Sequence, residues 1–111
     1  PILTHVTISN NTAEYYGGGM WLDYSNPILT HVTISNNTAE YYGGGMRLSN
    51  SNPILTNVTI ANNTANDGGG IYISASDPTL TNVAIANNAA GCGSRLPRYS
   101  IRSRNVDIIV Y

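Results

Sequence analysis

The chain has 111 residues, a net charge of −1, and charged residues at only 10% of its positions. This charge balance excludes a general attraction to nucleic acid or to anionic membranes. The single cysteine, Cys92, excludes an internal disulfide framework. No apolar run approaches the roughly 20 residues that a membrane helix needs, so we expect no membrane insertion.

The first twenty residues, PILTHVTISNNTAEYYGGGM, occur again without change at 27–46. Weaker copies begin at Pro53 and Pro78, so the starts are separated by 26, 26 and 25 residues. A fixed period of this length predicts a repeat architecture in which similar units stack on one another. Hydrophobic residues make up 41% of the chain, which is enough to give such a stack a core.

Each repeat contains three short apolar runs, and two of them, 6–8 and 20–22 in the first repeat, have the period of two that is typical of strands. In the first repeat these runs are 1–4, 6–9 and 19–22, and no stretch has the period of a helix. We therefore expect three short strands per coil, with like positions in successive coils about 4.8 Å apart. The chain must bend at His5 and its equivalents, because Leu3 and Val6 cannot share one face of a straight strand. The expected inward columns are Leu3/Leu29/Leu55/Leu80, Val6/Val32/Val58/Val83, Ile8/Ile34/Ile60/Ile85 and Met20/Met46/Ile71.

The C-terminal residues preserve a trace of the same repeat. The segment 105–108 (NVDI) matches 57–60 (NVTI), which extends the count to about five coils of 23–26 residues. We assign residues 1–96 to the stacked repeats and 97–111 to a degenerate final coil or C-terminal cap, since terminal repeats are commonly atypical. Residues 1–94 carry one arginine against five acids (net −4), and 95–111 carry four arginines against one aspartate (net +3).

Asparagine and glycine recur at fixed places in the repeat. Stacked asparagine side chains can form hydrogen bonds from one coil to the next, as in cross-β ladders. The glycine triplets at 17–19, 43–45 and 68–70 allow sharp turns and close approach of neighbouring chains. The expected asparagine ladder consists of Asn11, Asn37, Asn63 and Asn88.

These motifs resemble those of a known group of proteins. Ile-x-Asn-Asn followed by Gly-Gly-Gly-Met or Gly-Gly-Gly-Ile is similar to the FxxN and GGA[ILV] repeats of polymorphic outer-membrane proteins. It is also similar to the right-handed parallel β-helix repeats of secreted bacterial proteins. The resemblance covers residues 1–90 and implies an all-β, single-domain right-handed parallel β-helix that is extracellular or on the cell surface. The chain has Ile where that family often has Phe, and Gly where it often has Ala.

Catalytic and metal-binding residues are sparse. Glu14 and Glu40 could form the pair of carboxylates that a glycosidase needs, but they lie in a linker and arise from one duplicated sequence. His5 and His31 stack at one corner, whereas a zinc site normally has three or four protein ligands. We therefore expect no catalytic residue, no metal and no cofactor. Cys92 has no Cys or His neighbour in the sequence and is interpreted as a buried or incidental thiol.

Threonines and sequons also follow the repeat. Regular threonine arrays can bind ice, but Thr4/Thr30/Thr56 and Thr7/Thr33/Thr59 are expected to form single files on different faces, which argues against an ice-binding array. Asn-x-Thr sequons are permissive for N-glycosylation, or are by-products of the repeat. They begin at Asn10, Asn36, Asn57 and Asn62.

Aromatic residues form the candidate interaction surface. They precede the glycine triplets or occupy the outward column of the 19–22 run, and they are joined there by one arginine. Such residues are enriched at protein contacts, and aromatic columns could also stack on sugar rings. The alternative is that cross-coil aromatic pairs stabilise the sheet. The surface comprises Tyr15, Tyr16, Trp21, Tyr41, Tyr42, Arg47 and Tyr72.

Together these observations predict a non-catalytic structural module: a solenoid stalk, an adhesin segment or a self-assembling fibre subunit. The first repeat has no visible cap and its strand edge could template further pairing, so we expect head-to-tail self-association. The alternative is a carbohydrate- or ligand-binding module that uses the Tyr/Trp face, with a glycan or cell-surface partner. A polysaccharide-active enzyme is the third interpretation. Because the chain begins at Pro1 without a targeting segment, we also expect it to be a mature or excised part of a longer protein.

Overall fold

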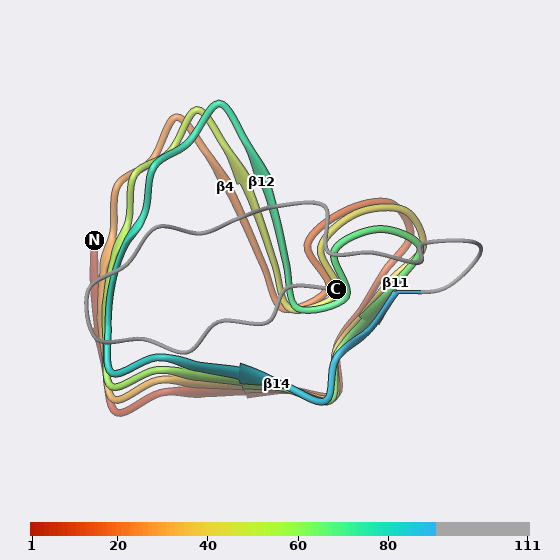
Figure 1. The fold of residues 1–111 in the computed structure, drawn as a ribbon, viewed down its shortest axis with the longest axis horizontal. Helices are drawn as coiled ribbons and strands as arrows, with labels where there is room; N and C mark the ends of the chain where they lie inside the picture. Colours follow the sequence, from red (N-terminus) through yellow and green to blue (C-terminus); the bar gives the residue numbers. More distant parts are fainter. Residues whose placement is uncertain (91–111) are drawn as a thin grey trace.

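The computed structural model describes residues 1–90, and these contain strands, bends and turns but no helix. They form three complete coils and the first three strands of a fourth. Successive coils follow nearly the same path when viewed along the stack (Figure 1). The predicted fifth coil and the cap at 97–111 lie outside the described residues.

Each complete coil contributes one strand to each of four sheets, and every pairing is parallel. Sheet 1 comprises β1 (Ile2–Thr4), β5 (Ile28–Thr30), β9 (Ile54–Thr56) and β13 (Thr79–Thr81). Sheet 2 comprises β2 (Thr7–Ser9), β6 (Thr33–Ser35), β10 (Thr59–Ala61) and β14 (Ala84–Ala86). Sheet 3 comprises β3 (Thr12–Ala13), β7 (Thr38–Ala39), β11 (Thr64–Ala65) and β15 (Ala89–Ala90). Sheet 4 comprises β4 (Met20–Asp23), β8 (Met46–Ser49) and β12 (Ile71–Ser74). The molecule is therefore a parallel β-helix.

The expectation of three strands per coil was wrong by one. The additional strand is the two-residue pair Thr12–Ala13 and its equivalents. Its alanine faces the core, as shown by Ala39 and Ala65, which are each only 2% exposed. A small residue is needed here because the glycine triplet passes close by: a Cβ on Gly44 would approach the Thr64 carbonyl carbon to 2.6 Å.

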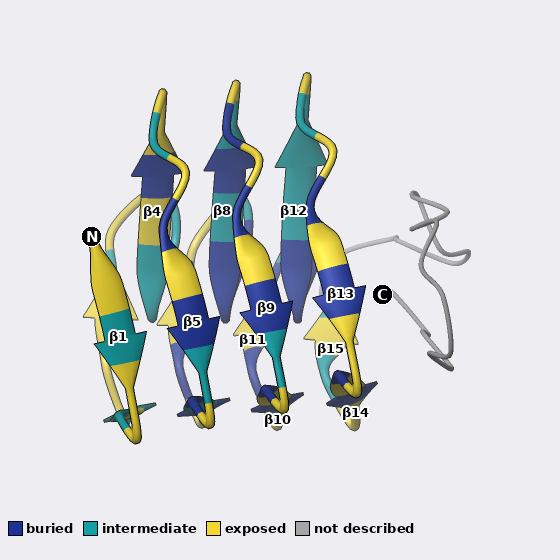
Figure 2. Cartoon of the chain, turned by 90° about the vertical axis from the view of Figure 1, so that its left-hand side faces the viewer, coloured by how far each residue is buried: buried dark blue, intermediate teal, exposed yellow. Residues whose placement is uncertain are grey.

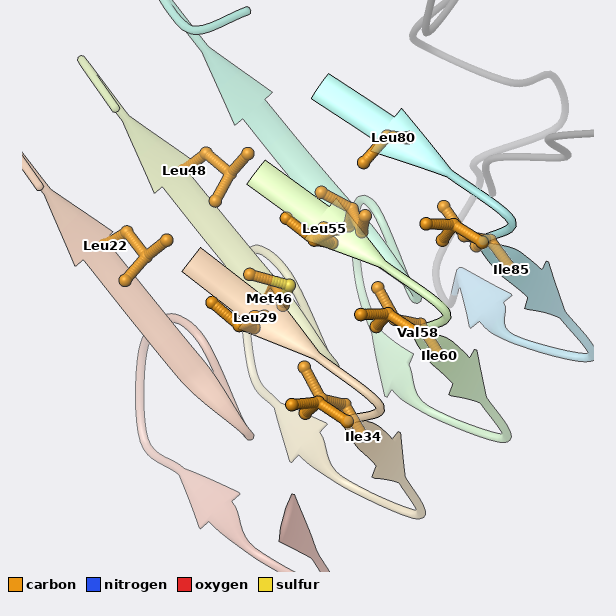
Figure 3. Close-up of a cluster of buried hydrophobic side chains, with 13 residues drawn as sticks. Leu22, Leu29, Ile34, Met46, Leu48, Leu55, Val58, Ile60, Leu80 and Ile85 are labelled. Atoms are coloured by element: carbon orange, nitrogen blue, oxygen red, sulfur yellow. The ribbon is translucent and has the colours of Figure 1, made fainter. Parts of the chain in front are cut away.

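The predicted inward columns form the core. Leu29, Val32 and Ile34 of the second coil are at most 1% exposed, and their partners in the third coil are equally buried. The side chains stack in register along the molecule (Figure 3). The corresponding residues of the first coil, Leu3 and Ile8, are only partly buried.

The bend at His5 is confirmed by its backbone. His5 has a φ of 55° and Asn57 a φ of 54°, in the left-handed region that lets the chain change direction between sheets 1 and 2. Asn36 turns the chain in the same way between sheets 2 and 3, with a φ of 57°. Asparagine and histidine are enriched in this conformation among non-glycine residues, which explains why they occupy the corners between sheets 1 and 2 and between sheets 2 and 3.

Candidate functional site

The candidate surface lies on the outer side of sheet 4 and on the loop that precedes it. Strand pairing aligns Trp21 with Arg47 and Arg47 with Tyr72, so these three side chains form one outward column. A bridge between Tyr16 and Tyr42 aligns the loops in the same way. The repeat register therefore brings the predicted residues together in space.

The aromatic rings form two stacks that run along the molecule. The ring centroids of Tyr16 and Tyr42 are 5.4 Å apart with planes at 6°, and those of Tyr15 and Tyr41 are 5.9 Å apart at 11°. Tyr72 extends the first stack, with its centroid 4.5 Å from that of Tyr42. Each of the five tyrosines thus packs against at least one neighbouring ring, which stabilises the sheet in the way that cross-strand aromatic pairs do.

Arg47 lies among these rings. Its guanidinium carbon is 4.3 Å from the ring centroid of Tyr16 and 5.6 Å from that of Trp21. The centroids of Tyr42 and Tyr72 are both 5.8 Å away. These are cation–π distances. The buried Nε atom has no hydrogen-bond partner among the residues that the structure describes. The sequence placed Arg47 in the column, but this stacking depends on side-chain conformations that no sequence motif specifies.

The surface remains partly open to solvent. Tyr15 is 54% exposed, Trp21 52% and Tyr41 40%. These three side chains are the accessible aromatic groups of the surface, since Tyr16, Tyr42 and Tyr72 are half-buried. A ligand would therefore meet Trp21 and Tyr15 first.

The predicted asparagine ladder is present and runs through the interior of the stack. The Nδ2 atom of Asn37 donates to Oδ1 of Asn63 at 3.0 Å and to the carbonyl oxygen of Ile8 at 3.0 Å. Asn63 repeats this pattern toward Asn88 and Ile34, both at 3.0 Å. Asn37 and Asn63 are fully buried, and each joins three consecutive coils.

A second ladder, of serines, was not predicted. The backbone N–H of Ser25 donates to Oγ of Ser51 at 3.0 Å, and that of Ser51 donates to Oγ of Ser76 at 2.8 Å. Ser51 is fully buried. The available signal was the recurrence of serine two residues before Pro27, Pro53 and Pro78, at the same spacing as the asparagines.

The other sequence candidates do not assemble into a site. Glu14 and Glu40 are both exposed, and the next coil has Asn66 in their column. The rings of His5 and His31 stack at 4.8 Å and 2° and are exposed. Within residues 1–90 no group of three His, Cys, Asp or Glu side chains could hold a metal ion. The same residues contain no helix long and apolar enough to cross a membrane, and Cys92 lies outside them.

The fold and the ladders define a parallel β-helix whose coils are copies of one unit. The family model described as a right-handed β-helix region matches residues 4–105. The chain therefore belongs to the right-handed β-helix family. No curated protein and no solved structure matches it.

Proposed function

We propose that this β-helix is a non-catalytic structural module of an extracellular or cell-surface protein. The observation that carries the proposal is the buried asparagine ladder, in which each internal Asn bonds both neighbouring coils. Side chains that are buried in this way hold the stack together and are not available for chemistry. The resemblance to repeats of secreted bacterial proteins supports the location.

We further propose that the module extends by head-to-tail stacking with a second copy. The first coil presents an apolar end, because Leu3, Val6, Ile8 and Met20 are only partly covered. Its strands form the edge of each sheet, and unpaired strand edges template further pairing. A contact between the first coil of one chain and the opposite end of another chain is heterologous. Such contacts build a filament unless the rotation from chain to chain closes them into a ring.

Sedimentation velocity of the full chain over a concentration series, with electron microscopy of the same samples, tests this proposal. We expect species that grow with concentration and appear as filaments. Leu3→Asp should suppress growth because it places a charge on the apolar end. Thr4→Asp is the matched control, since Thr4 faces outward in the same strand, and it should leave growth intact. A monomer at every concentration would contradict the stacking proposal.

A second candidate function, ligand binding, is favoured by the exposure of Trp21, Tyr15 and Tyr41. The apolar C–H face of a sugar ring can pack on such aromatic groups. We expect a glycan array to show binding by the wild-type chain and at least a tenfold weaker signal for Trp21→Ala, which corresponds to about 1.4 kcal/mol. Tyr24→Ala is the control, because Tyr24 is 77% exposed but lies outside the stacked surface. Equal binding by all three proteins would exclude a role for the surface.

A further inference from the structure

The threonines of this chain are confined to three of the four sheets and all face away from the core. Eleven threonines occur in the sequence, and each lies in a strand of sheet 1, 2 or 3. None is buried. β-branched side chains are stiff at χ1, so repetition in register gives a rigid array of methyl and hydroxyl groups.

Sheet 1 presents two files of outward side chains. The threonine column Thr4/Thr30/Thr56 forms a single file, as expected, and a file made mainly of isoleucines lies beside it. In each three-residue strand the first and third residues point outward, and the leucine between them points to the core. The alternation is visible along β5, β9 and β13 in Figure 2. The first file is Ile2, Ile28, Ile54 and Thr79, and the second file is Thr4, Thr30, Thr56 and Thr81.

The coils beneath this array stack with little rotation from one to the next. Successive coils follow nearly the same path when viewed along the stack (Figure 1), whereas neighbouring strands usually differ in direction by about 20–25°. The rings of His5 and His31, which directly follow Thr4 and Thr30, are 4.8 Å apart with 2° between their planes, and this agrees with such stacking. Outward groups therefore repeat about 4.8 Å apart across the strands and roughly 6.6 Å apart along them.

The strands of this face carry no charged side chain and no tyrosine or tryptophan, and His5 and His31 lie at the corner beside Thr4 and Thr30. Within residues 1–90 the charged side chains lie in sheet 4, in the loop before the glycines or in the turn before β13. The apolar side chains on the face are large: Ile2 is 71% exposed, Ile28 40% and Ile54 44%. Charged residues normally make up about a quarter of a globular protein. A surface without charge, on which the side chains are evenly spaced, suits a partner that is also uncharged and periodic. The absence of tyrosine and tryptophan from these strands disfavours a polysaccharide, for which the aromatic surface on sheet 4 is the better match.

We propose that the outer face of sheet 1 binds ice. Its strand spacing is close to the repeat of oxygen atoms along one axis of ordinary ice. The isoleucine and threonine methyl groups would hold first-layer water in a cage, while the threonine hydroxyl groups anchor that layer by hydrogen bonds. The leucine column beneath the face and the coil-to-coil backbone hydrogen bonds fix the array, so little conformational entropy is lost on binding.

The test is thermal hysteresis and inhibition of ice recrystallisation by the full chain. We expect activity in the wild-type protein and its loss to the level of a buffer blank in Thr30→Tyr, because a large side chain interrupts the array. Thr38→Tyr makes the same change in sheet 3 and should retain full activity. Tyrosine is tolerated in strands, and the melting temperature of each variant shows whether it has folded.

The proposal is wrong if the wild type has no ice activity, or if the two folded variants are equally active. Two further results would assign the face to another partner. They are pull-down by crystalline chitin or cellulose without ice activity, and a dimer that Thr30→Tyr dissociates while ice activity is absent. The ice-activity test and the head-to-tail test can fail separately. Leu3→Asp, the variant that tests head-to-tail growth, alters the end of the stack and leaves the outer face of sheet 1 unchanged.

Discussion

Replacing Asn63 with alanine should lower the free energy of unfolding by about 3–5 kcal/mol, because buried polar groups left without partners cost roughly 1–3 kcal/mol each. The Asn63 side chain donates to Asn88 and Ile34. Its Oδ1 accepts from the backbone N–H and the Nδ2 atom of Asn37 at 2.9 and 3.0 Å. All four bonds disappear in the variant, and Asn63 is fully buried, so water cannot replace them.

Two controls isolate the ladder. Asn11→Ala alters the exposed end of the same column and should cost much less, since water can satisfy the groups that it frees. Asn62→Gly changes the adjacent exposed corner, whose φ of 58° suits glycine, and should have little effect. Urea denaturation with comparable m-values provides the measurement. Equal losses in all three variants would show that the ladder does not carry the stability assigned to it.

Gly44→Ala should destabilise the chain by roughly 3 kcal/mol or more, because overpacking against rigid neighbours is among the costly mechanisms of mutation. Gly44 is buried, and its new methyl group would lie 2.5 Å from the carbonyl oxygen of Gly69. It would also overlap the carbonyl oxygen of Thr64. Both obstacles are backbone atoms of the next coil, so relief requires the two coils to separate.

Gly70→Ala provides the graded comparison. Its methyl group would meet side-chain atoms, at 2.8 Å from Nδ2 of Asn88 and 3.0 Å from Cγ2 of Ile85, and side chains can shift. We expect it to be less destabilising than Gly44→Ala in thermal unfolding followed by circular dichroism. If the two variants have the same melting temperature, the close approach of neighbouring coils at Gly44 does not account for the loss of stability.

The columns of the core could be predicted from the sequence because one unit is repeated almost without change. The identity of 1–20 and 27–46 sets the register of neighbouring coils, and the apolar alternation then decides which residues point inward. The register of the repeats also predicted the asparagine ladder. The bend at His5 followed from the three-residue offset between Leu3 and Val6, and the backbone confirms it.

Other features depend on information that alternation does not carry. The strand Thr12–Ala13 is too short to show a period of two. Alternation places Ile2 and Ile54 on the outer face beside the inward leucines, but it does not show how far they are exposed. The stacking of Arg47 on four rings requires side-chain positions from three coils at once.

Hydrogen exchange of the asparagine side-chain amides, followed by NMR, tests most directly the claim that the coils are held together by the ladder. The amide groups of Asn37 and Asn63 should be protected nearly as strongly as the backbone of the core, because releasing them requires the stack to open. Their exposed neighbours Asn36 and Asn62 should exchange without protection. If the buried and exposed asparagines exchange at the same rate, the ladder does not hold the coils together and the structural role proposed for the chain loses its basis.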